Sequence, residues 1–409
     1  MTLFLRSHAR IRPFLAFALV LFAGLVQPAP SLAQVRPVLS LGGEVRPRLF
    51  GREPVLGQWD HWISMRTRVE LKARFQSGFG LFFQAQDVRF WGEELSNRDA
   101  SADRLDFHQA YLEVDSVPGI GGSFRAGRQE VALGEGRFIS APDWGQAGQS
   151  FDGVRWLRPM GEASVELVYL RLQEGSSSGH DTSADFTALA FSSSQGSLGS
   201  VDFLAVHDRT GGSPETSRTT IGPTWWKRSG IVSFRFQAMK QFGEAAGRDI
   251  SATMLAGRAT LHWLDDRARL TLWYDRLSGD SDPTDNTSRS FSTLFGARHR
   301  YYGRSDFFLD IPEDTGGLGL RDRALKMEYY PTDLLSVYLD FHSFRTDEQG
   351  ALSDRNLAEE IDLWVQYRFR DTLDLEVGYS FTRAGAAMEE LGRLDGTANL
   401  AYFMTSLRF

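Results

Sequence analysis

The sequence has no cysteine and very little lysine, which occurs only at positions 72, 227, 240 and 326. Without cysteine the chain has no disulfide framework, no thiol nucleophile and no thiolate metal site. All the remaining basic residues, out of 45 lysines and arginines, are arginines. Because the planar arginine fork suits carboxylates and phosphates, this bias fits contact with anions, and GC-rich codon usage is the alternative explanation.

The chain also lacks an excess of positive charge and, after its N-terminus, any long apolar run. The formal net charge is −7, which excludes the overall basic surface that nucleic-acid binding needs. At the N-terminus, Arg6, Arg10 and Arg12 precede an apolar stretch at 14–26 and a small-residue cleavage site at 31–33. This order predicts a cleaved signal peptide at residues 1–33 and a mature chain at 34–409. An uncleaved anchor helix is disfavoured, because the apolar stretch is short for a bilayer.

Apolar and polar residues alternate with a period of two along most of the mature chain. In residues 63–75, Ile63, Met65 and Val69 belong to one face, and Arg66 and Arg68 belong to the other. Long strands with one apolar and one charged face are typical of outer-membrane barrels. The alternation predicts about eighteen strands, at 36–50, 60–76, 79–92, 104–116, 122–131, 149–158, 162–173, 184–194, 199–209, 216–227, 230–242, 248–263, 266–278, 319–331, 334–346, 357–370, 372–383 and 397–409.

The connections between these strands differ systematically in length. Connections from an even-numbered to the next odd-numbered predicted strand are tight, whereas most of the others are longer, and the largest covers about 279–318. Short turns at one end and long loops at the other distinguish a bacterial outer-membrane barrel from a soluble β-sandwich. We therefore expect one all-β domain: a transmembrane, antiparallel, up-and-down β-barrel at 34–409.

The last nine residues, "AYFMTSLRF", continue the alternation to Phe409. We expect this strand to pair with the first one and so close the sheet, which removes unpaired edges from a medium without water. Ala401, Phe403, Leu407 and Phe409 would then face lipid, and Met404, Ser406 and Arg408 the lumen or rim. Barrel-assembly machinery is expected to recognise such an aromatic-ended strand.

Four segments resemble a known family. They are "GRQEVALGEGRFISAPDWGQAGQSFDGVRW" at 127–156, "FGARHRYYGRSDFF" at 295–308, "LAEEIDLWVQYRF" at 357–369 with the following "LEVGYSFT", and the closing strand. Together they resemble the alginate-export family of outer-membrane barrels over most of 35–409. The resemblance implies a monomeric barrel of eighteen strands in the bacterial outer membrane, with an arginine-lined pore for an anionic polysaccharide. Its cargo is left open by the variable "SAPDWGQAGQ" loop.

Arginines on the inward face are the candidate conduit residues. Alternation directs Arg66, Arg68, Arg74, Arg125, Arg155, Arg235, Arg258 and Arg368 inward. The resemblance assigns conduit roles to Arg128, Arg155 and Arg298. Because Glu70, Asp340, Asp362, Asp374 and Glu376 are also expected to face inward, the predicted lumen is mixed in charge. The alternative is that these arginines pair with acids across strands merely to fill the lumen.

Catalytic and metal-binding signatures are weak. The segment "GQSFDG" is not a nucleophile elbow, zinc-ligand spacing is missing, and no cofactor is predicted. Acidic clusters at 280–282 and 313–314 suit calcium, but solvated loops explain them as well. We therefore expect a non-enzymatic channel that passes an anionic polysaccharide or oligosaccharide of the alginate-like uronate class. The alternatives are a diffusion porin for small acidic nutrients and, less favoured, an outer-membrane hydrolase or adhesin.

Overall fold

The computed structural model describes residues 36–55, 58–92, 105–173, 176–177, 180–181, 184–194, 196–211 and 215–409. The predicted signal peptide at 1–33 lies outside the described residues. The first half of the chain contains β1 (Val38–Val55), β2 (Gln58–Arg74), β3 (Phe79–Phe90), β4 (Asp106–Val114), β5 (Ser123–Gln129), η1 (Gly134–Gly136), β6 (Phe151–Met160), β7 (Ala163–Gln173), β8 (Ser176–Ser177), β9 (His180–Asp181), β10 (Ala184–Ser194), η2 (Gly196–Leu198) and β11 (Ser200–Thr210).

The second half continues the same pattern and adds two short helices. It contains β12 (Thr216–Ser229), β13 (Val232–Ala245), β14 (Arg248–Trp263), β15 (Ala268–Leu277), β16 (Thr287–Ser288), α2 (Arg298–Tyr301), η3 (Glu313–Thr315), β17 (Leu320–Thr332), β18 (Leu335–Arg345), β19 (Asn356–Phe369), β20 (Leu373–Ala384), α3 (Ala386–Glu390) and β21 (Thr397–Arg408). In the described part of the chain, no helix has the length and apolar character needed to cross a membrane.

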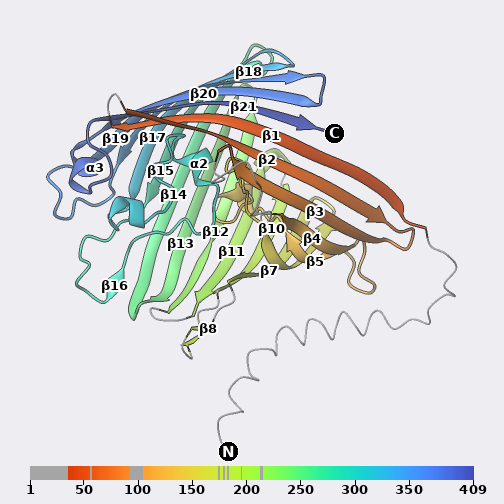
Figure 1. The fold of residues 1–409 in the computed structure, drawn as a ribbon. Coiled ribbons are helices and arrows are strands. Elements are labelled where there is room, and N and C mark those ends of the chain that lie inside the picture. The colour runs from red at the N-terminus through yellow and green to blue at the C-terminus, as the bar shows by residue number, and fades with distance from the viewer. Residues whose placement is uncertain are drawn as a thin grey trace, which may run out of the picture.

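Eighteen of these strands form a closed antiparallel barrel (Figure 1). Each barrel strand pairs with its neighbours in sequence, and β1 pairs with β21 to close the sheet. The other three strands are accessory: β8 and β9 pair with each other, and β16 lies parallel to the start of β14. All eighteen predicted strands are present, so the predicted fold class is confirmed. The largest shift in bounds is at the first strand, which continues to Val55.

The seam between β1 and β21 has an incomplete ladder. Its register runs from Glu44↔Arg408 to Glu53↔Asn399, but it skips Arg46 and Pro47. Proline has no N–H to donate, so a gap at this position follows from the sequence. The predicted facing of the last strand is confirmed: Phe403 and Leu407 are exposed on the outer surface, whereas Ser406 is buried.

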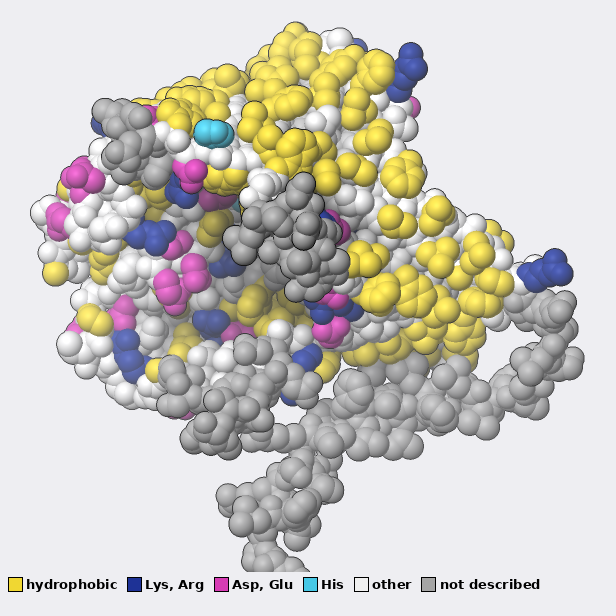
Figure 2. All heavy atoms as spheres, viewed as in Figure 1, with side chains coloured by type: hydrophobic (Ala, Val, Ile, Leu, Met, Phe, Trp, Pro, Cys, Tyr) yellow, Lys and Arg dark blue, Asp and Glu magenta, His cyan; other side chains and the backbone are white. Residues whose placement is uncertain are grey.

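The wall is apolar outside and polar inside, the reverse of a soluble protein. On β2, Val69 and Leu71 are exposed while Arg66 and Arg68 are buried, as the alternation predicted. Hydrophobic side chains cover much of the visible barrel wall, and charged side chains gather at the end that carries the loops (Figure 2). An apolar band of this kind faces the hydrocarbon core of a membrane.

Two loops at the long-loop end fold into the barrel: residues 130–150, between β5 and β6, and residues 278–319, between β15 and β17. Their backbones pair, because Ser140 N donates to Phe295 O (3.1 Å) and Phe295 N donates to Phe138 O (2.9 Å). Gly296 permits this approach, since a Cβ there would lie 1.9 Å from Arg137 O.

The main apolar core of the protein lies inside the barrel rather than in its wall. Phe138 and Ile139 of the 130–150 loop and Phe291 and Phe308 of the 278–319 loop are fully buried against inward-facing wall residues such as Met254. The largest predicted loop, at about 279–318, therefore fills part of the lumen. The remaining lumen is polar and contains the candidate site.

Candidate functional site

Every predicted conduit arginine forms an ion pair with a carboxylate. The partners are Glu44 and Asp143 for Arg66, Glu130 and Asp143 for Arg68, Glu113 and Asp115 for Arg74, Glu113 for Arg125, Asp152 for Arg128, Glu166 for Arg155, Glu135 for Arg235 and Arg258, Asp310 for Arg298, and Asp374 for Arg368. The predicted mixture of charges in the lumen is therefore present. These arginines fall into groups according to the strand or loop that supplies the partner carboxylate.

Arg128 and Arg298 form the first group, and Arg128 does not lie where a conduit residue was expected. Arg128 alternates with the buried, inward-facing Gln129 and pairs with Asp152 at 3.2 Å, so it lies on the outer face of the wall. Its placement in the lumen is corrected for this reason: the strand β5 continues through Gln129, and its alternation turns Arg128 outward. Arg298 is the first residue of α2 in the inward-folded 278–319 loop and lies 3.6 Å from Asp310 of the same loop, so its conduit role stays a prediction.

A second group pairs within the wall. Arg125 and Arg155 are cross-strand neighbours on β5 and β6, and they bind Glu113 and Glu166, respectively, on the adjacent strands. Arg74 shares Glu113 with Arg125. These contacts match the lumen-filling alternative, because acids and arginines on neighbouring strands satisfy one another without a ligand.

A third group meets the 130–150 loop. Arg46, Arg66 and Arg68, which we call the arginine socket, extend from β1 and β2 and surround the Asp143 carboxylate. Arg46 Nη1 lies 2.9 Å from Asp143 Oδ2, and Arg66 Nη1 lies 2.7 Å from Asp143 Oδ1. Arg68 Nη1 is farther away, at 3.8 Å from the same Oδ1. Burial opposes the charge on Asp143, but the hydrogen bond from Arg66 and the nearby guanidinium charges outweigh it and lower its pKa.

The same loop is anchored a second time on the opposite part of the wall. Glu135 lies 3.0 Å from Arg235 and 3.5 Å from Arg258, which are cross-strand partners on β13 and β14. Next to it, Arg137 Nη1 donates to Asp275 Oδ2 on β15 at 2.5 Å, and both side chains are completely buried. Burial opposes the Arg137 charge, but Asp275 and two tyrosines raise its pKa.

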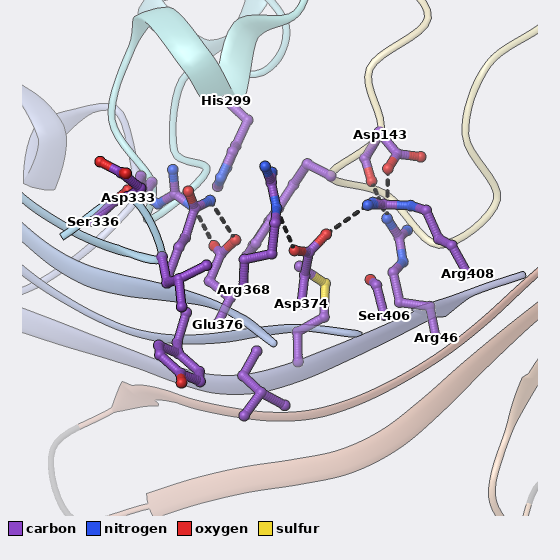
Figure 3. A pocket seen from close by; sticks show the side chains of 17 residues that line it. Arg46, Asp143, His299, Asp333, Ser336, Arg368, Asp374, Glu376, Ser406 and Arg408 are labelled. Carbon is purple, nitrogen blue, oxygen red and sulfur yellow. Dashed lines mark hydrogen bonds and ion pairs between the residues drawn. The ribbon is translucent and has the colours of Figure 1, made fainter. Parts of the chain in front are cut away.

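A cavity of about 440 Å³ lies under the two loops, near the short-turn end of the barrel (Figure 3). Four guanidiniums line it, from Arg46, Arg304, Arg368 and Arg408, together with the carboxylates of Asp143, Asp333, Asp374 and Glu376. Asp374 joins Arg368 and Arg408 through contacts of 3.2 and 2.5 Å. We call this space the first cavity.

A second cavity of about 330 Å³ lies on the other side of the arginine socket. Arg66, Arg68 and Asp143 line it, and Asp143 and Arg408 are shared with the first cavity. Asp143 therefore stands at the boundary between the two spaces. Carboxylates and guanidiniums line both spaces, so both are polar.

Aromatic contacts hold the two loops together above the first cavity. Trp144 stacks on His299 with ring centroids 3.9 Å apart, and its Nε1 donates to Asp306 Oδ2 at 2.9 Å. His299 Nδ1 also contacts Asp306, at 2.5 Å. Burial lowers the pKa of His299, and the contact with Asp306 opposes this shift. The Arg48 guanidinium lies over the Trp144 ring, 4.7 Å from its centroid.

Sequence reasoning missed several residues of this site. Arg46 and Arg48 alternate with Val45 and Leu49 in a predicted strand, so the same pattern that identified Arg66 could have identified them. By contrast, alternation carries no information about Asp143 or Arg304, since both lie in loops that fold inward. Arg304 Nη2 donates to Tyr402 Oη (2.7 Å) and to Glu376 Oε1 (3.0 Å).

In the described segments of the chain, no group of three or more histidine, aspartate or glutamate side chains is placed to hold a metal ion. In the acidic cluster near 280–282, Arg248 and Arg289 contact the Asp280 carboxylate at 2.7 and 3.5 Å. These guanidiniums take the position that a cation would need.

The sequence model of one family, described as alginate export, matches residues 38–398. The chain belongs to the alginate export family. Among proteins with curated descriptions, none matches it. Of the solved structures, the outer membrane protein OprD from Pseudomonas aeruginosa has 13% sequence identity and a TM-score of 0.63, with 93% of this chain and 95% of that chain covered. OccD3 (OpdP) from the same organism has 15% identity and a TM-score of 0.61, with 94% and 97% covered.

These likenesses at low sequence identity establish the fold, and the family match and the closed barrel place this alginate export family member in the bacterial outer membrane. Its family and fold are of the porin and channel type. The predicted family, fold class and location are thereby confirmed. The identity of the solute is a separate question, which depends on the residues inside the lumen.

Proposed function

We propose that this alginate export family member passes an anionic polysaccharide or oligosaccharide of the uronate class through its lumen. The observation that carries the proposal is the arginine socket, where three nearly buried guanidiniums converge on one carboxylate. Each sugar unit of a uronate chain carries a carboxylate, and the guanidinium fork suits that group. Acidic residues beside the arginines keep an anion from binding so tightly that it cannot leave.

The arrangement of the lumen supports stepwise passage of an extended chain. The two cavities of about 440 and 330 Å³ lie on either side of Asp143, so carboxylates of successive sugar units could contact different arginines. Arg368 and Arg408 would contact the chain at the short-turn mouth, and Arg66 and Arg68 would contact it deeper in the lumen. Arg74, Arg125 and Arg155 would support the wall charge beside this path.

Block of ionic current tests the proposal directly. In planar bilayers, micromolar trigalacturonate should interrupt the current through single channels, and a neutral maltotriose control of similar size should not. Equal permeation of cations and anions together with no block by trigalacturonate would contradict the proposal. Replacing both Arg66 and Arg68 by glutamine should weaken the block, because the socket loses two of its three cations.

A diffusion porin for small acidic nutrients is the second candidate, and the inward-folded loops favour it. They divide the lumen into spaces of the size that proteins use for small ligands. Liposome swelling separates the two candidates: faster swelling with monocarboxylates than with oligouronates would favour the porin.

We further propose that the mature chain, after removal of residues 1–33, functions as a monomer in contact with outer-membrane lipid. The closed sheet supports this, since it leaves no strand edge in the barrel for another chain to extend. Barrel-assembly machinery would insert it, and the aromatic Phe409 would be part of the recognised strand. N-terminal sequencing and the mass of the purified protein in detergent test the cleavage and the monomer.

A further inference from the structure

The arginine socket shows an unusual contrast in burial. The Arg46, Arg66 and Arg68 side chains are 2%, 1% and 8% exposed, whereas the Asp143 side chain between them is 56% exposed. Buried guanidiniums need a carboxylate, because an unpaired buried charge is strongly destabilising. Here the three cations are part of the wall, and Arg66 also pairs with Glu44 of the wall, but the one anion that all three cations share approaches from the open side. This is the geometry of a bound ligand rather than of a wall residue.

Without the Asp143 carboxylate the socket would be short of anions. Among the described residues, Arg46 makes no other ion pair, Arg68 keeps only Glu130 at 3.5 Å, and Arg66 keeps Glu44. In the same part of the structure, Arg68 Nη2 is buried without a hydrogen-bond partner, as is Nε of the adjacent Arg48. The socket and the adjacent Arg48 therefore have N–H donors that the Asp143 carboxylate does not bind.

The backbone of the loop is held in place by contacts that do not involve the Asp143 carboxylate. Arg46 donates to the carbonyl oxygens of Asp143 (2.6 Å) and Gly145 (3.0 Å), and Arg48 donates to Trp144 O (2.8 Å). The Gln146 side chain donates to Ser64 Oγ at 3.0 Å. The carboxylate can thus leave the socket by side-chain rotation while the loop stays docked.

We propose that the arginine socket is a binding site for one substrate carboxylate, and that Asp143 occupies it as an internal substitute. An incoming uronate carboxylate exchanges with the Asp143 side chain, which turns into either adjoining cavity. This inference rests on the proposed function, which it deepens by naming the competing group. Exchange keeps the buried arginines paired at every moment, so that an anion enters and leaves without exposing an uncompensated charge.

Removing the competitor tests the inference. If Asp143 occupies the socket in about nine of ten molecules, then Asp143→Ala should tighten binding about tenfold, because all of the sockets become available. The measurement is the trigalacturonate concentration that halves single-channel current. Asp143→Glu retains a carboxylate and should stay near the wild-type value. Asp285→Ala is the matched control, since it removes a loop carboxylate that contacts Arg248 and Arg289 but borders neither cavity.

The outcomes separate this inference from the function on which it rests. If trigalacturonate blocks the wild-type channel and Asp143→Ala leaves this block unchanged or weaker, the inference is overturned. The proposed uronate channel is still supported by that result. If trigalacturonate blocks neither protein but Asp143→Ala gains block by acetate, the socket is confirmed and the uronate function fails. If neither probe blocks either protein, both are overturned. A heat-dependent gel shift of each variant shows that its barrel is folded.

Discussion

Replacing Asp275 by leucine should release the 130–150 loop from the barrel wall without unfolding the barrel. Asp275 is the carboxylate partner of Arg137, and both side chains are almost fully inaccessible to solvent. Removing one member of such a pair costs about 3–5 kcal/mol, because the other charge is left buried and unpaired. At about 1.4 kcal/mol per factor of ten, the docking equilibrium of the loop would shift a hundred- to a few thousand-fold.

The free-energy cost of Asp275→Leu should affect the docking of the loop rather than the fold of the barrel, because backbone hydrogen bonds hold the barrel together. Asp275 lies in β15, whose backbone ladders to β14 and β17 do not depend on its side chain. Tyr302 Oη accepts a hydrogen bond from Arg137 Nη1 at 3.1 Å, and this neutral group cannot replace the lost charge. We therefore expect a folded barrel with a looser interior.

Single-channel recording and limited proteolysis measure the release. Asp275→Leu should increase the open-channel conductance and make the 130–150 loop sensitive to protease. The double variant Arg137→Met with Asp275→Leu should restore both properties toward wild type, since apolar pairs of similar volume replace buried ion pairs at little cost. Unchanged conductance and a protected loop in Asp275→Leu would refute the assignment of this pair as the anchor of the loop.

Three further outcomes follow from the structure. Trp144→Ala should increase current fluctuations by weakening the contact between the loops by about 0.5–1.5 kcal/mol, whereas Trp144→Phe, which keeps a ring on His299, should do so less. Gly43→Val should reduce the yield of folded barrel, because a Cβ at Gly43 would lie 2.5 Å from Phe409 Cζ and 2.6 Å from Arg68 O, and normal membrane yield would argue against it. The lowered pKa of Asp143 keeps its contact with the arginines intact above the ordinary value of 3.8, and the contact is lost only as the pH falls through the lower folded value. The difference between wild type and Asp143→Ala in trigalacturonate block should therefore be the same at pH 7 and pH 5, and its disappearance at pH 5 would count against this linkage.

Strand number, order and facing could be predicted from the sequence because each depends on a local rule. Alternation of Val69 and Leu71 with Arg66 and Arg68 reports directly which side faces lipid. The same rule identified the inward arginines on β2, β13, β14 and β19. Arg128 was assigned to the conduit by the family resemblance and not by this rule, and the alternation of β5 with the buried Gln129 places it on the outer face.

The interior of the barrel could not be predicted in this way. The positions of Asp143 and Arg304 result from packing between two long loops, in which Phe138, Ile139 and Phe291 are buried together. Such contacts join residues more than 100 positions apart and have no period in the sequence. The predicted conduit arginines were found, but their loop partners were not, and those partners decide which arginines are available to a solute.

The seam between β1 and β21 has a consequence for how the barrel forms. Every other pairing between barrel strands joins strands that are consecutive around the barrel, so each closes a smaller loop than the seam does and loses less loop entropy, even across the 278–319 loop. Closure instead brings together residues as distant as Glu44 and Arg408, and its ladder is interrupted at Arg46 and Pro47. The barrel should therefore form its hairpins first and its seam last, and the two strands that hold Arg46 and Arg408 should be the last to reach their final register.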